Sequence, residues 1–150
     1  MSHTPSEAAR EVLAVVPLIM FAIRSDMRGG RAHGLSVPQF RALGFVHRRA
    51  GSSLSEVAGH IGLTLPAMSR LIDGLVEQQL MRRRNQSADR RRVTLTLTAK
   101  GARLLESALK KTQAALAERL AALSQTDVAA VVSALRKMQP LFARNEKKAE

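Results

Sequence analysis

The sequence changes its periodicity in the segment MRRRNQSADRRRVTLTLTAKG, which covers residues 81–101. From Val93 to Leu97 apolar and polar residues alternate strictly, as they do in a half-buried β-strand. The stretch from Met81 to Arg84 can pair with this strand, and the residues between them are polar and rich in arginine. The segment therefore predicts a long β-hairpin with a basic loop.

Helices are predicted on both sides of this hairpin. The sequence Ser53-Leu54-Ser55-Glu56 is a capping box that begins a short helix, and Gly62 ends that helix. Thr64 can cap the next helix, and Thr98 can cap the helix that follows the hairpin. A short helix, a turn, a second helix and a hairpin form, in this order, a winged helix-turn-helix.

Long helices with apolar seams are predicted at both ends of the chain. We therefore expect a mostly α fold, in which a winged helix-turn-helix DNA-binding domain (residues 36–97) is joined to a helical dimerisation domain (residues 1–35 and 98–150). The alternative is that the seams pack against each other within one chain. The seam residues are Val12, Val15, Val16, Ile19 and Ile23, then Leu105, Leu109, Leu116, Leu120 and Leu123, and finally Val128, Val131, Leu135, Met138 and Phe142.

The composition favours a polyanionic partner. Lysine and arginine outnumber aspartate and glutamate by 24 to 12, which gives a net charge of +12. Aromatic residues make up only 3% of the chain, so RNA readers that stack bases on aromatic side chains are disfavoured. The longest apolar stretch, from Val12 to Ile23, is shorter than the about 20 residues of a membrane-spanning helix. We expect a cytoplasmic protein without a membrane partner.

Catalytic and metal sites are not indicated. The sequence shows no Ser/His/Asp set, carboxylate pair, phosphate-binding loop or nucleotide fingerprint, so we do not expect an enzyme or a cofactor. The absence of cysteine excludes thiolate metal ligands and thiol redox sensing. No two of the four histidines have the i, i+4 spacing of a helical metal site, so no metal is expected.

The helix after Gly62 has the design of a recognition helix. Its first turns carry small and polar residues, which can enter the major groove without clashing. Ala67 can contact a thymine methyl group, Ser69 can donate to a base or a phosphate, and Arg70 can bind guanine O6 and N7. The hairpin loop adds six arginines against one acid between Arg82 and Arg92, which suits a narrow minor groove. The expected DNA-binding residues are Thr64, Pro66, Ala67, Ser69, Arg70, Arg90, Arg91 and Arg92.

The segments from Ser69 to Leu75 and from Asp89 to Gly101 together resemble the recognition helix and wing of the MarR family, the multiple-antibiotic-resistance-type regulators. The second segment has the family's pattern of Asp-Arg-Arg, a strand, and Leu-Thr-x-x-Gly. The resemblance implies a homodimer formed by the first helix and the last two helices, palindromic operators and, usually, release by a small molecule. It also implies that Asp89 orients the wing by pairing with Arg91. Gln79 departs from the pattern, because the family commonly has glycine there, and this leaves the angle of the wing open.

The resemblance further implies a small aromatic or amphipathic effector bound between the dimer helices and the winged helix. Candidate residues are Ile19, Phe40 and His47, for which plain core packing is the competing interpretation. We expect a sequence-specific regulator of transcription that represses from a pseudo-palindromic site on double-stranded DNA. The alternative is a nucleoid-type architectural DNA-binding protein without an effector, which would lack the regulator's preference for one sequence.

Overall fold

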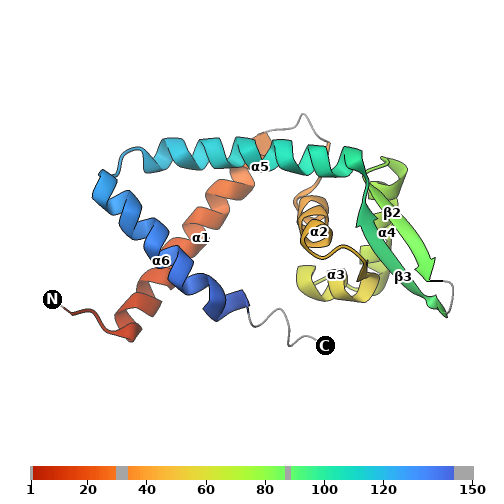
Figure 1. Ribbon diagram of the computed structural model, residues 1–150, viewed down its shortest axis with the longest axis horizontal. Coiled ribbons are helices and arrows are strands. Elements are labelled where there is room, and N and C mark those ends of the chain that lie inside the picture. Colours follow the sequence, from red (N-terminus) through yellow and green to blue (C-terminus); the bar gives the residue numbers. More distant parts are fainter. Residues whose placement is uncertain (1, 30–33, 87–88, 144–150) are drawn as a thin grey trace.

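The computed structural model describes residues 2–29, 34–86 and 89–143 of the chain (Figure 1). This part is mostly α, with a β-hairpin inserted between the fourth and fifth helices, as the sequence predicts. In chain order the elements are α1 (Pro5–Gly29), α2 (Val37–Arg48), β1 (Ser52–Ser53), α3 (Leu54–Ile61), α4 (Leu65–Glu77), β2 (Met81–Gln86), β3 (Asp89–Leu97), α5 (Ala99–Leu120) and α6 (Gln125–Ala143).

Local capping explains where the helices begin. At the start of each helix, a hydroxyl oxygen accepts a hydrogen bond from the backbone N–H three residues later. Each bond satisfies one of the N–H groups that a first helical turn leaves without a partner. The predicted caps at Ser53, Thr64 and Thr98 are confirmed, and Thr4, Ser36 and Ser124 cap their helices in the same way.

The predicted hairpin is confirmed as β2 and β3, which pair antiparallel with Met81 opposite Leu97 and Arg83 opposite Leu95. The register is irregular between Asn85 and Gln86, near the tip of the hairpin. The sequence did not indicate β1, a strand of two residues that pairs with the other edge of β3. The sheet order is therefore β1-β3-β2, and β3 is its central strand.

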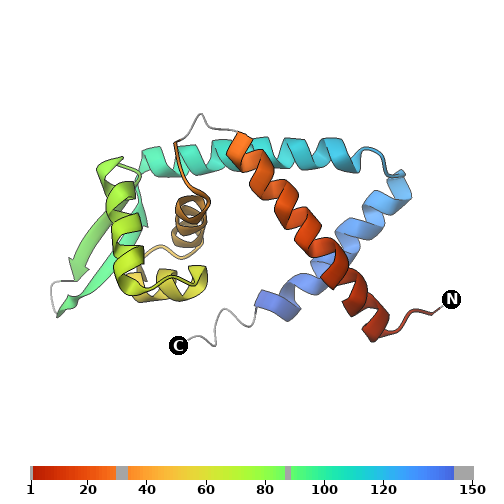
Figure 2. The same cartoon turned by 180° about the vertical axis from the view of Figure 1, so that it is seen from behind.

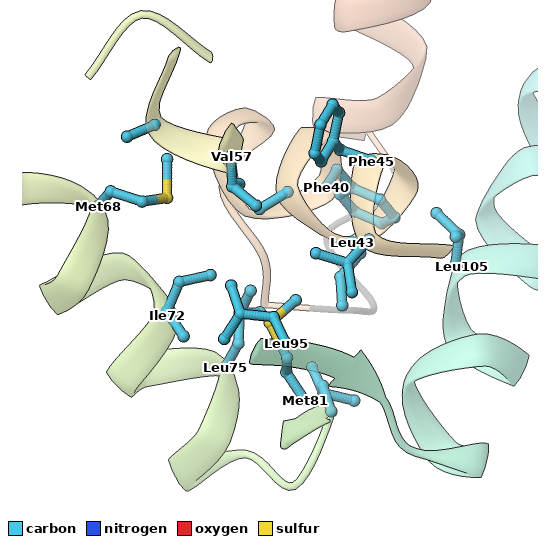
Figure 3. Packing of buried hydrophobic residues seen from close by; sticks show 14 of the residues in the cluster. Phe40, Leu43, Phe45, Val57, Met68, Ile72, Leu75, Met81, Leu95 and Leu105 are labelled. Atoms are coloured by element: carbon cyan, nitrogen blue, oxygen red, sulfur yellow. The ribbon is translucent and has the colours of Figure 1, made fainter. Parts of the chain in front are cut away.

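The hydrophobic core lies inside the winged helix (Figure 3). Helix α2 supplies its centre, since its residues Phe40, Leu43 and Val46 are all buried. Helices α3 and α4, the sheet and the first half of α5 close around α2. The other labelled core residues are Phe45, Val57, Met68, Ile72, Leu75, Met81, Leu95 and Leu105.

Helix α5 links the winged helix to the terminal helices (Figures 1 and 2). The winged helix gathers at its N-terminal end, and α6 leaves from its other end. Helix α1 packs against α5, and Asp26 Oδ1 lies 3.4 Å from Arg119 Nη2. Within the described residues, no helix is both long enough and apolar enough to cross a membrane.

Much of the predicted apolar seams is exposed in the single chain, together with other large apolar side chains of the same helices. We call these side chains the terminal apolar residues, because all of them lie on α1, on α5 and the turn after it, or on α6. Their exposed fractions run from 38% at Met20 to 76% at Leu13. The terminal apolar residues are Leu13, Val15, Val16, Leu18, Ile19, Met20 and Phe21, then Leu109, Leu120 and Leu123, and finally Val132, Leu135, Leu141 and Phe142.

Candidate nucleic-acid interface

Helix α4 is anchored along one side and open along the other. Met68, Ile72 and Leu75 are fully buried in the core and hold the helix against α2 and α3. Because these residues occupy one face, the opposite face of the first turns points outward. Of the predicted contact residues on α4 and its cap, Ala67 and Ser69 are half-buried, while Thr64, Pro66 and Arg70 are exposed.

An arginine of β2 joins this helix to the sheet. Arg83 Nη2 donates to the backbone carbonyl and to Oγ of Ser69, each at 3.1 Å, and lies 3.1 Å from Asp73 Oδ1. The hydroxyl of Ser69, assigned to DNA from the sequence, thus already accepts one hydrogen bond within the chain. It keeps its own O–H as a donor, so the intramolecular bond leaves it able to donate to a phosphate or a base.

Arg83 is a positioning residue that the sequence analysis did not single out. Arg83 could have been predicted from the alternation of side chains along β2. This alternation puts Arg83 on the same face as the buried Met81. An inward-facing arginine needs an anionic or carbonyl partner, and Asp73 and Ser69 on α4 are the partners.

The wing itself is described only in part. The backbone of residues 89–92 belongs to β3, whereas the side chains of Asp89, Arg90, Arg91 and Arg92 lie outside the described part of the structure. Their assigned roles therefore stay predictions. On the neighbouring strand β2, the side chains of Arg82 and Arg84 are exposed, so the hairpin presents basic groups beside α4.

Gln79 ends α4 in the left-handed conformation that glycine usually supplies. Its φ is 59°, its N–H donates to the carbonyl of Val76 at 2.9 Å, and the N–H of Leu80 donates to the carbonyl of Leu75 at 2.9 Å. These two bonds form a Schellman motif around a residue other than glycine. The departure at Gln79 therefore does not change how the helix ends.

The end of α4 is also fastened to the start of α5. The Thr98 hydroxyl donates to the Gln79 carbonyl at 2.6 Å, and Lys100 Nζ donates to the Gln78 carbonyl at 3.0 Å. Gly101 lies so close to the backbone of Leu80 that a Cβ at this position would be 2.0 Å from the Leu80 carbonyl oxygen. The Leu-Thr-x-x-Gly pattern is thus a close-packed joint, with a threonine that caps α5 and a glycine that admits a backbone carbonyl.

The three candidate effector residues do not share one environment. Phe40 is buried in the core with 5% of its surface exposed, Ile19 is a terminal apolar residue, and His47 is exposed on α2. Over the described ranges, no three histidine or acidic side chains come together in a way that could hold a metal ion.

Comparison with known proteins agrees with this geometry. Residues 33–92, which carry α2, α3, α4 and most of the hairpin, match the model of the MarR family. The winged helix of this chain is therefore similar to that of the MarR family. An uncharacterised HTH-type transcriptional regulator of Bacillus subtilis, YsmB, is 25% identical to the chain over 107 residues, which are 71% of this chain and 73% of YsmB.

Solved structures extend the likeness to the terminal helices. A MarR family protein from Bacillus stearothermophilus superposes with a TM-score of 0.78 at 20% identity, over 94% of this chain and 99% of the other. Rv2887, a MarR family protein of Mycobacterium tuberculosis solved with p-aminosalicylic acid, gives a TM-score of 0.67 at 25% identity, over 84% and 96% of the two chains. The MarR fold thus covers nearly the whole chain.

Proposed function

We propose that this chain is a sequence-specific repressor of the MarR family that binds a pseudo-palindromic operator on double-stranded DNA as a homodimer. The observation that carries the proposal is the outward first turn of α4, anchored by buried residues and flanked by a hairpin rich in arginine. An anchored helix with an open N-terminal turn can enter the major groove. We expect such a DNA-binding regulator to act in the cytoplasm.

The proposal assigns different roles to the arginines of α4 and of the wing. Arg70 is exposed in the second turn of α4, where its planar fork can bind one guanine. Arg90, Arg91 and Arg92 contact the minor groove or its phosphates, and Asp89 orients the wing by pairing with Arg91. Arg70→Ala should therefore cost about 1–3 kcal/mol at one symmetric base-pair position and relax the preference there.

The terminal apolar residues support the homodimer. Leaving so many leucine, valine and phenylalanine side chains in water is unfavourable, and a second copy of the same helices can cover them. We assign residues 1–35 and 98–150 to the dimerisation domain and residues 36–97 to the DNA-binding domain. Sedimentation at micromolar concentration should show one species of twice the 16.3 kDa chain mass, and a clean monomer would contradict this architecture.

We further propose that a small aromatic or amphipathic ligand releases the operator. The support is the p-aminosalicylic acid held by the related Rv2887. Ile19, Phe40 and His47 remain the candidate contacts. If the proposal holds, p-aminosalicylic acid lowers the operator affinity of the parent, and substitution of a contact residue weakens this effect. An affinity that is unchanged by a panel of aromatic acids would contradict ligand release.

A selection from random duplex DNA tests the function as a whole. The purified chain is incubated with the pool, and the retained fragments are sequenced. A repressor recovers one pseudo-palindrome, with half-sites about 10 bp apart, and binds it about 10³-fold more tightly than random DNA. The second candidate, an architectural DNA-binding protein, is favoured by the net charge of +12 and predicts even recovery of all sequences.

A further inference from the structure

One leucine of the winged helix is left in water. Among the large apolar side chains that the structure describes between residues 34 and 98, only Leu65 is exposed, with 50% of its surface accessible. The other exposed large apolar side chains of the described chain are the terminal apolar residues, on the far helices. A single exposed leucine is unremarkable by itself. Leu65 is of interest because it lies at the start of α4.

Leu65 is the first residue of α4, between the N-cap Thr64 and Pro66. The Thr64 hydroxyl accepts the N–H of Ala67 at 3.4 Å, and the Thr64 carbonyl accepts the N–H of Met68 at 2.9 Å. Pro66 restricts the backbone of the same turn further. The turn that presents Leu65 is thus already ordered in the free chain, so little conformational entropy is lost when its side chain meets a partner.

An apolar side chain in the first turn of a major-groove helix has one obvious apolar target. Of the four bases, only thymine presents a methyl group at its major-groove edge. Leu65 reaches farther from the helix than Ala67, the residue to which the sequence assigns a methyl contact, and Ala67 is already half-buried. A second copy of the chain would cover the terminal helices rather than this turn, so Leu65 stays accessible in the proposed homodimer.

We propose that Leu65 is a specificity-determining residue that packs against a thymine methyl group in each half-site of the operator. This inference rests on the proposed function, because it needs α4 to lie in the major groove. Burial of one methyl group contributes about fourfold in affinity. The preference is therefore modest at each thymine and acts beside the polar contacts of Arg70 and Ser69.

The test combines protein variants with operator duplexes in which one thymine at a time is replaced by deoxyuridine, which removes only the methyl group. For the parent we expect at least one position per half-site at which deoxyuridine lowers affinity about fourfold. Leu65→Ala should bind the thymine operator about fourfold more weakly and should be insensitive to deoxyuridine at that position. Arg70→Ala is the matched control, since it should lose affinity but keep the deoxyuridine effect.

The outcomes separate this inference from the proposed function. If the parent selects an operator but deoxyuridine weakens its binding at no position, no side chain reads a methyl group. If deoxyuridine weakens the parent and Leu65→Ala equally at every position, another residue such as Ala67 reads the methyl group. Either result overturns the inference. If the parent selects no preferred sequence, the proposed function itself fails. Thermal melts verify that Leu65→Ala is folded, as expected for an exposed side chain at the start of a helix.

Discussion

The joint between α4 and α5 can be tested with one methyl group. Gly101 is a buried residue in the first turn of α5, and a Cβ added there would lie 2.0 Å from the carbonyl oxygen and 2.9 Å from the carbonyl carbon of Leu80. The obstructing atoms belong to the backbone, so no side-chain rotation can relieve the clash. Gly101→Ala must therefore move α5 away from the end of α4 by at least about 1 Å.

The size of the effect follows from the bonds at this joint. A shift of this size breaks the hydrogen bonds from the Thr98 hydroxyl, the Thr98 N–H and Lys100 Nζ to the carbonyls of Gln79, Leu80 and Gln78. Each such bond contributes about 1 kcal/mol, or about 3 kcal/mol together. The higher helix propensity of alanine offsets about 1 kcal/mol. The net loss in the free energy of unfolding is about 2 kcal/mol, equivalent to a fall in Tm of roughly 4–8 °C.

Thermal and urea unfolding at one fixed protein concentration measure this loss. Gly59→Ala is the matched control, because Gly59 lies in helix α3 and a Cβ there would have no neighbour within 4 Å. This control should gain about 0.5–1 kcal/mol in the free energy of unfolding. If Gly101→Ala is as stable as the parent while Gly59→Ala behaves as expected, α5 does not approach Leu80 as closely as described, and the reasoning is wrong.

Other features of the interface give further predictions. Gln79→Gly should raise the free energy of unfolding by about 0.5–1 kcal/mol, because glycine adopts a φ of 59° without steric strain; a lower Tm would contradict this reading of the helix end. A double-mutant cycle with Asp73→Asn and Arg83→Gln should give a coupling energy of about 0.5–1 kcal/mol, since Asp73 is largely exposed; zero coupling in urea unfolding would show that the ion pair does not stabilise the fold. If the dimer neutralises about eight phosphates, log affinity should fall against log salt with a slope near −7, and Arg91→Ala should flatten it by about one unit per wing. Asp89→Ala should weaken DNA binding at fixed salt although it removes a negative charge, and tighter binding would show that Asp89 does not hold the wing.

Features of the fold that depend on neighbouring residues alone were predictable from the sequence. The N-caps at Ser53, Thr64 and Thr98 need only a hydroxyl and the next three residues, and all of them are observed. The hairpin and the inward face of α4 follow from periods of two and about 3.6 residues. The pairing of Asp89 with Arg91 and the small-molecule effector came from the resemblance to the MarR family, because these local rules do not give them.

Features that depend on distant parts of the chain were not predictable. Arg83 binds Ser69 only because β2 returns alongside α4, 14 residues away in the sequence. Gly101 is needed because the carbonyl of Leu80 lies above it, and nothing near Gly101 in the sequence shows this. Gln79 stands where the family commonly has glycine and therefore left the angle of the wing open. In the structure the bonds that Leu80 and Thr98 make around Gln79 hold it in the conformation that glycine usually supplies.

The fastened joint also has a mechanical consequence. Because α4, the hairpin and the start of α5 are tied together, they must turn as one rigid lever when α5 tilts. Helix α5 has 22 residues and is about 33 Å long, at 1.5 Å per residue. A tilt of about 6° around its far end would carry the recognition helix through roughly 3.4 Å, the rise of one base pair along a strand. In the proposed complex, a small change of angle among the terminal helices would therefore be enough to move α4 out of register with the DNA.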